Sequence, residues 1–249
     1  HTAYVAWIEP FTMMTALSSV TRHIGLVCTS STGFEQPFSL ARKFASLDLV
    51  SGGRAGWNLI PSANPLEWRN FGAEPQGSRD KRYARAREFA HIVQGLWDSW
   101  DDDAFVLDKK AGIFFDPEKL HVLDHKGEHF QVRGPLNVSR SPQGQPVLVQ
   151  AGASDDGRDL AAETSDVIFA AATTIDIARE FYADVKARVA RHGRNPDHVV
   201  IMPGFQVMIG RTEQEAREKF QALQDLIHPT VGVRHLSQYI GYELSGYPI

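Results

Sequence analysis

Two patterns of apolar residues alternate along the chain. In some segments apolar residues recur every three or four positions, which is typical of a helix with one buried face, and in others they form short unbroken runs, which is typical of a buried strand. The helical pattern covers residues 10–22, 39–49, 81–100, 157–164, 174–192 and 212–226. The strand pattern covers residues 24–31, 54–60, 146–152, 166–171 and 199–209. This alternation predicts βαβ units and a parallel sheet with both faces covered.

Local signals mark several of the predicted boundaries. Gly52 and Gly53 follow the second helix, and Pro61 follows the second strand. Glycine pairs and proline commonly end regular elements. Residues 212–215 have the spacing of a capping box, which begins a helix. The last predicted strand contains Pro203, and we expect a kink there.

Residues 101–145 differ in composition from the rest of the chain and are predicted to be an insertion. They are polar, contain Gly and Pro, and include an alternating stretch, residues 121–132, that predicts a hairpin folding at residues 126–127. The stretch carries three histidines at spacings of four, which are His121, His125 and His129. That spacing aligns imidazoles on a helix, whereas in a hairpin the side chains need not converge. We therefore expect no metal there, and a metal site is the alternative.

Composition and charge exclude several classes of protein. The 26 Lys and Arg residues against 30 Asp and Glu give a formal net charge of -4, which leaves no basic excess for a nucleic-acid backbone. The single cysteine, Cys28, excludes an internal disulfide and a cysteine-rich zinc site, and it fits a reducing compartment. No apolar run approaches the roughly 18 residues that predict a membrane span. Because the chain begins at His1 rather than at Met, we expect the protein to extend beyond the given sequence.

The turn after the third predicted strand is the sharpest local feature. The strand ends at Gly152 and a helix begins soon after Ser154. Small residues let the backbone approach a ligand there, and free amides with the helix dipole favour an anion, to which Arg158 would add a positive charge. The alternative is that Ser154 only caps its helix, with Asp155 and Asp156 as acids of the first turn.

Four further positions are candidates for ligand contacts. Arg79 and Tyr83 begin the long helix, where they would offer a charge and a phenol to a phosphate, and a solvated helix start is the alternative. Thr29 lies near the end of a predicted parallel strand, where ligands of α/β proteins bind. Asn58 is polar within an apolar strand and needs a partner, either a ligand or a neighbouring group.

A series of ordered motifs resembles one family. The motifs occupy residues 51–58, 69–72, 82–85, 95–100, 133–137 and 146–152. In this order and spacing they resemble the nitrilotriacetate monooxygenase family of bacterial-luciferase-like flavin monooxygenases. Relatives in that family act on EDTA, dibenzothiophene sulfone, long-chain alkanes and a pristinamycin precursor. The resemblance runs from about Glu9 to Pro248.

The resemblance implies a fold. It is an α/β fold, the (β/α)8 TIM barrel, formed by a single domain over residues 1–249 with the insertion at residues 101–145. Members of the family are longer than this chain, and by analogy the first two strands and the last are absent. Residues 24–31 would then be the third strand, and open sheet edges would be exposed.

The resemblance also assigns flavin contacts position by position. Thr29 matches a threonine that closes the family's third strand, which is residues 24–31 here. Tyr83 matches a tyrosine at the start of the long helix, and Ser154 matches a serine in the loop after residues 146–152. Arg79 stands where the family usually has a histidine, and we expect it to contact the flavin phosphate. Pro61 replaces a usual threonine, which leaves the substrate open.

The activity implied is that of the larger component of a two-component monooxygenase. It would take FMNH2 from a separate NAD(P)H:FMN reductase in the cytoplasm, form a C4a-peroxyflavin with O2 and oxygenate a small organic substrate. A homodimer or homotetramer is expected, with no nucleic-acid or membrane partner. Two rivals stay open: a flavin- or phosphate-binding barrel protein without oxygenase activity, and a metal-dependent barrel hydrolase that uses the histidine stretch.

Overall fold

The computed structural model describes residues 6–62, 65–72, 77–240, 242–244 and 246–247. The chain divides into two compact units, Ile8–Gly204 and a smaller unit that includes Phe205–Ile249. The helices of the larger unit are α1 (Pro10–Val20), α2 (Pro37–Ser51), α3 (Pro65–Arg69), α4 (Arg79–Trp97), α5 (Asp155–Thr164) and α6 (Ile175–Arg191). Its strands are β1 (Leu26–Ser31), β2 (Ala55–Ile60), β3 (His125–Lys126), β4 (Gln131–Val132), β5 (Val147–Gln150), β6 (Val167–Ala170) and β7 (Val200–Pro203). The smaller unit contains α7 (Glu213–Asp225) and α8 (Pro229–Ile240).

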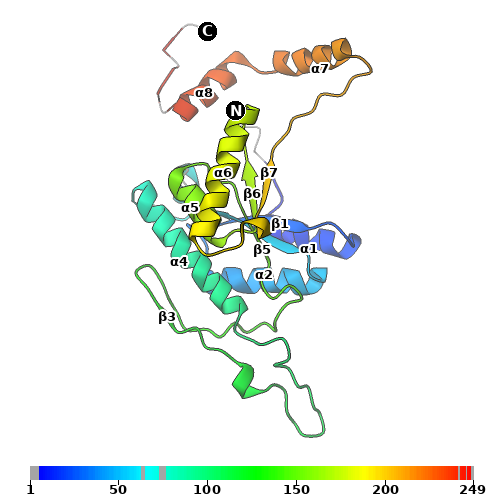
Figure 1. Cartoon of the computed structure of the whole chain (residues 1–249), viewed down its shortest axis with the longest axis vertical. Helices are drawn as coiled ribbons and strands as arrows, with labels where there is room; N and C mark the ends of the chain where they lie inside the picture. Colours follow the sequence, from blue (N-terminus) through cyan, green and yellow to red (C-terminus); the bar gives the residue numbers. More distant parts are fainter. Residues whose placement is uncertain (1–5, 63–64, 73–76, 241, 245, 248–249) are drawn as a thin grey trace. The chain divides into compact units, whose positions relative to one another are not determined.

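The main sheet is parallel, as the alternation of strands and helices predicts. Its strands lie in the order β1-β2-β5-β6-β7, and each neighbouring pair runs in the same direction. Thr29 lies opposite Asn58, and Asn58 lies opposite Val149. The helices that follow the strands lie along the sheet (Figure 1). Parallel order places the carboxyl ends of all five strands at one edge, where ligands of α/β proteins bind.

Helices bury one face of this sheet, whereas the sequence pattern predicts two covered faces. Cys28 and Trp57 are fully buried on the helical side. Alternate residues of the strands point the other way, and Val27, Phe169 and Met202 are 45%, 46% and 53% exposed. The crossover between parallel neighbours is right-handed, so successive crossovers in one direction along a sheet put every helix on the same side. The apolar second face is therefore the inner face of the fold.

The core between the sheet and its helices is built from aromatic side chains. Trp57 of β2 packs within 5.9 Å of Phe89 and within 5.8 Å of Phe44, measured between ring centroids. Its indole nitrogen donates to the carbonyl oxygen of Ser30 at 3.0 Å. Trp97 meets Trp57 edge to face, which joins α4 to the same cluster. This packing fixes α2 and α4 against the first two strands.

Polar residues around the start of β2 hold three segments together. Arg54 donates to the carbonyl oxygens of Ser18, Thr21 and Ile24, which closes the end of α1 and the turn after it. Fully buried Asp48 of α2 accepts from the amide of Ala55 and from both nitrogens of Gln143. Buried charges are stable when paired in this way, so these contacts fix the entry to β2.

The segment between α4 and β5 extends from the helices as long loops (Figure 1). It contains the predicted hairpin, whose strands β3 and β4 pair antiparallel over two residue pairs. Glu88 of α4 anchors it by accepting from the His125 imidazole at 2.9 Å and from the amides of His129 and Phe130. Burial raises the pKa of Glu88, but these hydrogen bonds outweigh it and the pKa lies below its ordinary value.

Several boundaries differ from the sequence pattern. Helix α4 ends at Trp97 rather than at residue 100, because Ser99 bonds its hydroxyl to Leu96 and to the amide of Leu136. Strand β7 ends at Pro203 rather than at residue 209, since proline has no amide to continue the ladder. The short helix α3 lies in a segment that the pattern describes only as a loop.

Candidate functional site

The turn between β5 and α5 brings two glycines into contact. A Cβ atom built on Gly152 would lie 2.7 Å from the Cα atom of Gly157, and one on Gly157 would lie 2.8 Å from that of Gly152. Only hydrogen fits at either position, so the chain turns tightly from strand to helix. The Ser154 hydroxyl accepts from the amide of Gly157 at 3.2 Å and caps α5. The capping role predicted as the alternative is therefore present in the structure.

Tyr83 lies beside the same turn. Its hydroxyl is 3.4 Å from the Ser154 hydroxyl, across a separation of 71 residues in the sequence. It would also lie 3.0 Å from a Cβ atom on Gly157. Two of the residues that the sequence singles out are thus brought together at the start of α5. The hydroxyls of Tyr83 and Ser154, with the amides of Asp155 and Asp156 that precede the capped amide of Gly157, form a set of donors suited to an anion.

Arg79 is the first residue of α4, one turn before Tyr83. Its side chain is exposed, and no hydrogen bond or ion pair joins it to any residue that the structure describes. Four residues apart on one helix, Arg79 and Tyr83 lie on the same face. Part of the loop before α4, including Pro75, lies outside the described residues. The guanidinium of Arg79 is therefore uncommitted within the described part of the chain.

Thr29 is held by its neighbour on β2. The Asn58 side-chain amide donates to the Thr29 hydroxyl at 3.0 Å, so the buried-strand asparagine finds a protein partner. Thr29 is exposed on the inner face of the sheet, next to Val27 in the alternation of β1. No hydrogen bond joins it to Tyr83 or Ser154. The structure thus brings Tyr83 and Ser154 into contact and places Thr29 on a separate strand of the same sheet.

One of the two acidic residues at the start of α5 has a basic partner, whereas Asp156 has none among the described residues. Asp155, which would repel a phosphate, pairs with Arg188 of α6 at 2.5 Å, and Arg188 also pairs with Asp184 at 3.0 Å. Arg158 is committed as well, because it donates to the carbonyl oxygen of Ala153 at 3.0 Å and to Asp184 at 3.1 Å. Arg158, which the sequence suggests as a positive charge for a bound anion, is therefore already bonded to groups of the protein.

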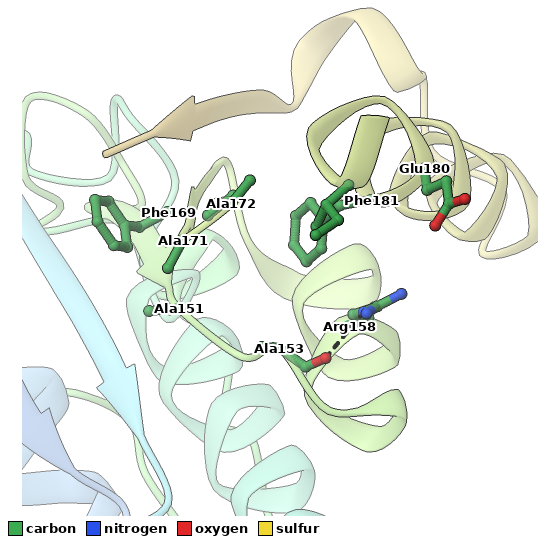
Figure 2. A pocket seen from close by; sticks show the side chains of 10 residues that line it. Ala151, Ala153, Arg158, Phe169, Ala171, Ala172, Glu180 and Phe181 are labelled. Atoms are coloured by element: carbon green, nitrogen blue, oxygen red, sulfur yellow. Dashed lines mark hydrogen bonds between the residues drawn. The ribbon is translucent and has the colours of Figure 1, made fainter. Parts of the chain in front are cut away.

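A pocket of about 230 Å³ opens beside this turn, between α5 and α6. Figure 2 shows Arg158 reaching from α5 to the Ala153 carbonyl, with Phe181 and Glu180 on α6. The guanidinium carbon of Arg158 lies 5.1 Å from the Phe181 ring centroid. The rest of the lining is mostly alanine and phenylalanine from the ends of β5 and β6. The pocket is therefore a small, mostly apolar space that reaches Ala153 of the turn, with Arg158 and Glu180 as its charged lining.

The three histidines of the hairpin do not share one centre. His121 pairs with Asp101 at 2.9 Å, and His125 pairs with Glu88 at 2.9 Å. The His129 ring packs against Phe130. The set of three possible metal ligands found among the described residues lies elsewhere and consists of Asp159, Glu163 and His192. The hairpin histidines thus contact different partners, as expected for a hairpin.

Two buried side chains stand apart from the predicted site. Gln150, at the end of β5, is 1% exposed, and neither atom of its amide has a hydrogen-bond partner in the described structure. Sequence reasoning did not select it, although a glutamine ending an apolar strand is a visible signal. Cys28 is fully buried, and burial raises the pKa of its thiol to about 12. A thiol of that pKa is no nucleophile at neutral pH.

This parallel sheet, with Tyr83 and Ser154 meeting at the start of α5, corresponds to a known family. The sequence profile described as luciferase-like monooxygenase matches residues 1–243. The chain therefore belongs to the luciferase-like monooxygenase family, and its fold is the TIM-barrel type of that family. The family and the fold class predicted from the ordered motifs are both confirmed.

Particular relatives narrow the comparison. The chain is 51% identical to N-acetyl-S-(2-succino)cysteine monooxygenase of Bacillus subtilis (strain 168), over 100% of this chain and 57% of that protein. It is 48% identical to nitrilotriacetate monooxygenase component A of Aminobacter aminovorans, over 94% of this chain and 52% of that protein. A crystal structure of riboflavin lyase with modified FMN and substrate riboflavin aligns with a TM-score of 0.90 at 37% identity, covering 98% of this chain and 55% of that one.

The chain thus spans between half and three fifths of the length of these relatives. The two curated relatives are named monooxygenases, and one is named as a component of its system. Within the described residues, no helix has the length and apolar character needed to cross a membrane.

Proposed function

We propose that the protein is the oxygenase component of a two-component flavin monooxygenase, which uses FMNH2 and O2 to oxygenate a small organic substrate. The observation that carries this proposal is the meeting of Tyr83 and Ser154 at the first turn of α5, with uncommitted Arg79 one turn away on α4. Family membership and the FMN in the riboflavin lyase structure support flavin as the ligand.

The turn suits a phosphate for reasons that belong to this structure. The close approach of Gly152 and Gly157 leaves room only for hydrogen at both positions, so the turn brings the start of α5 directly up to the end of β5. The α5 dipole favours negative charge at its start. Arg188 neutralises Asp155, which removes one of the two acidic charges in the first turn of α5. Ser154 and Tyr83 would donate their hydroxyl hydrogens to phosphate oxygens, and Arg79 would add a charged donor.

Bound flavin would supply the electrons that activate O2, which is chemistry that no side chain offers. The protein's own part is to hold, orient and shield. Thr29 and Asn58 would contact the flavin from the inner face of the sheet, where their side chains already pair. The apolar residues of that face, including Val27, would exclude water from the reaction.

A separate NAD(P)H:FMN reductase is the partner that this proposal implies. This matches a relative that is named component A. The cytoplasm, where nicotinamide cofactors are available to such a reductase, is the setting that the proposal implies. A homodimer or homotetramer stays a prediction.

A second candidate function has one observation in its favour. Riboflavin lyase, at 37% identity and a TM-score of 0.90, is described with riboflavin as its substrate. A protein of this fold can therefore act on a flavin instead of using it only as a cofactor. In that case riboflavin would be consumed, whereas an oxygenase would leave the flavin intact after each cycle.

Supplying the protein with FMNH2 from a flavin reductase under O2 tests the two candidates together. The substrate panel contains amino-polycarboxylates, S-substituted cysteines, sulfones, sulfides and alkanes. The proposal predicts that one compound yields a product carrying one added oxygen atom, detected by mass spectrometry with ¹⁸O2. Label-free products, or cleavage of added riboflavin, would contradict it. Reductase alone is the control for peroxide formed without the protein.

A further inference from the structure

An ion-pair network joins α4 to α5 next to the proposed flavin site. Arg87 of α4 donates from Nε to Glu163 at 2.6 Å and from a terminal nitrogen to Asp159 at 2.7 Å. The second oxygen of Glu163 lies 2.9 Å from His91, and the second oxygen of Asp159 lies 3.0 Å from His192. We name these five residues the α4–α5 clamp. All four carboxylate oxygens are engaged, so the clamp fixes the two helices at one spacing.

The clamp lies further along the same two helices than the candidate phosphate site. Arg87 follows Tyr83 by four residues, so both side chains project from the same face of α4. Asp159 follows the cap residue Ser154 by five residues, so it lies little more than one turn into α5. The contact between Tyr83 and Ser154 and the bonds of Arg87 are therefore successive contacts along one helix–helix interface.

Tyr83 depends on this interface for its position. Its hydroxyl lies 3.4 Å from that of Ser154, which is too long for a strong hydrogen bond to fix the ring. The same hydroxyl would lie 3.0 Å from a Cβ atom on Gly157, so the distance between α4 and α5 decides where it points. Ala86 of α4 and Leu160 of α5 are buried in one apolar core cluster, which gives no directional contact. Arg87 supplies two directional bonds between the helices, and His91 supplies a third through Glu163.

The same carboxylates do not carry a proposal for a metal. Asp159, Glu163 and His192 offer ligand atoms within 4.8 Å of one another. However, the Arg87 guanidinium already donates to both carboxylates, and a cation there would face its fixed positive charge. The geometry that suits an arginine fork opposes a divalent ion at the same oxygens.

We propose that Arg87 is a positioning residue for flavin binding, acting through Tyr83 to set the spacing of the phosphate site. This inference rests on the proposed flavin function. Arg87 itself does not touch the ligand. Its loss should therefore reduce the preference for FMN over riboflavin, which lacks the phosphate, rather than reduce binding of the flavin ring.

The test compares dissociation constants for FMN and riboflavin in the same preparations of wild type and variants. The riboflavin-to-FMN ratio of these constants cancels any inactive fraction that poor folding creates. Arg87→Gln should lower this ratio about three- to tenfold, the size of coupling found between residues of one network. Arg87→Lys should lower it less, because lysine keeps the charge but cannot bond both carboxylates with a fixed fork.

Two further variants separate positioning from general stability. In a Tyr83→Phe background, Arg87→Gln should have little further effect on the ratio, because the group through which it acts is already lost. Arg217→Gln is the matched control, since Arg217 forms an ion pair with Glu213 at 2.5 Å within α7. It should leave the ratio at the wild-type value.

The outcomes divide cleanly. Two results would overturn the positioning role alone. One is a wild-type preference for FMN that Arg87→Gln leaves unchanged. The other is a double variant in which the effects of Arg87→Gln and Tyr83→Phe on the ratio multiply in full. Equal weakening of both flavins by Arg87→Gln would also overturn it, because the helix spacing would then not act on the phosphate. Equal binding of FMN and riboflavin by wild type would remove the phosphate site itself, and the inference with it.

Discussion

At the scale of single residues, Ser154 caps α5 and is proposed to bind the flavin phosphate, and one substitution tests both roles through separate measurements. Its hydroxyl caps α5 by accepting from Gly157 at 3.2 Å and lies beside the Tyr83 hydroxyl. Ser154→Ala should lower the free energy of unfolding by about 1 kcal/mol through the lost cap. It should also weaken FMN binding about tenfold or more, the effect of losing a hydrogen bond to a charged group.

Thr212→Ala is the control for Ser154→Ala. Thr212 caps α7 with the same 3.2 Å contact, to the amide of Glu215, and lies outside the candidate site. It should leave FMN affinity unchanged. Urea denaturation and fluorescence titration measure the two effects. Unchanged FMN affinity in Ser154→Ala would leave that residue with the capping role only.

Arg79 makes the electrostatic prediction at this scale. Its side chain is exposed and has no partner among the residues described, so its removal should cost little stability. If it contacts the flavin phosphate, Arg79→Ala should weaken FMN binding about tenfold and riboflavin binding hardly at all. The effect should shrink at high salt. Equal weakening of the two flavins would place Arg79 outside the site.

At the scale of elements, the turn from β5 to α5 sets the shape of the site. A methyl group on Gly157 would lie 2.8 Å from Gly152 Cα and 3.0 Å from the Tyr83 hydroxyl. Gly157→Ala should therefore destabilise the protein by about 1–3 kcal/mol and weaken FMN binding. Gly232→Ala is the control, because a methyl group there meets nothing closer than 3.7 Å and alanine favours helix α8. A stable Gly157→Ala variant with normal FMN affinity would contradict the tight turn.

The α4–α5 clamp gives a prediction for how the free energy of unfolding depends on pH. The hydrogen bond from His91 lowers the pKa of Glu163, and burial opposes this effect. With the bonds from Arg87, the pKa falls to about 2. The folded state therefore holds this proton less tightly than the unfolded chain, whose ordinary value is 4.5. The stabilisation by Glu163 is complete above about pH 4.5 and is lost as the pH falls towards 2.

Urea denaturation of wild type and Glu163→Gln across this range measures that stabilisation. The wild type should be the more stable protein at pH 6, and the difference should shrink steadily between pH 4.5 and 2. Glu213→Gln, which removes an exposed pair on α7, should change stability by less than about 0.5 kcal/mol throughout. A wild-type advantage that grows on acidification would contradict the pairing of Glu163.

The order of most elements was predictable because they have a clear local pattern. The parallel strands and α1, α2, α4, α5, α6 and α7 follow from apolar spacing, whereas α3 and α8 were not predicted. Contacts between distant segments were not predictable in the same way. Nothing in the sequence marks Arg87 as a bridge to Asp159, since an arginine on an amphipathic helix is usually solvated. The end of α4 was set too late, because Ser99 bonds to Leu136, which lies far along the chain.

The candidate site divides in the same manner. Ser154 and Tyr83 were singled out from a strand–turn–helix pattern and from family motifs, and the structure brings them into contact. The approach of Gly152 to Gly157 explains why small residues occur there. The commitment of Arg158 to Asp184 and the neutralisation of Asp155 by Arg188 depend on α6, which no local pattern connects to this turn.

At the scale of the whole molecule, the parallel sheet carries an exposed apolar inner face and a polar site at the start of its helices. Family membership accounts for the position of the candidate site, because barrels of this type bind ligands at the carboxyl ends of their strands. The chain spans 57% of the length of a relative to which it is 51% identical. The candidate site lies within this part of the relative's length.

The most direct measurement is the equilibrium binding of FMN and riboflavin to the wild-type chain, followed by flavin fluorescence at low ionic strength. The account rests on a phosphate site formed by Ser154, Tyr83 and Arg79. It predicts that FMN binds at least about tenfold more tightly than riboflavin, and that inorganic phosphate competes with FMN but not with riboflavin. Equal affinity for the two flavins, with no competition by phosphate, would contradict the central claim.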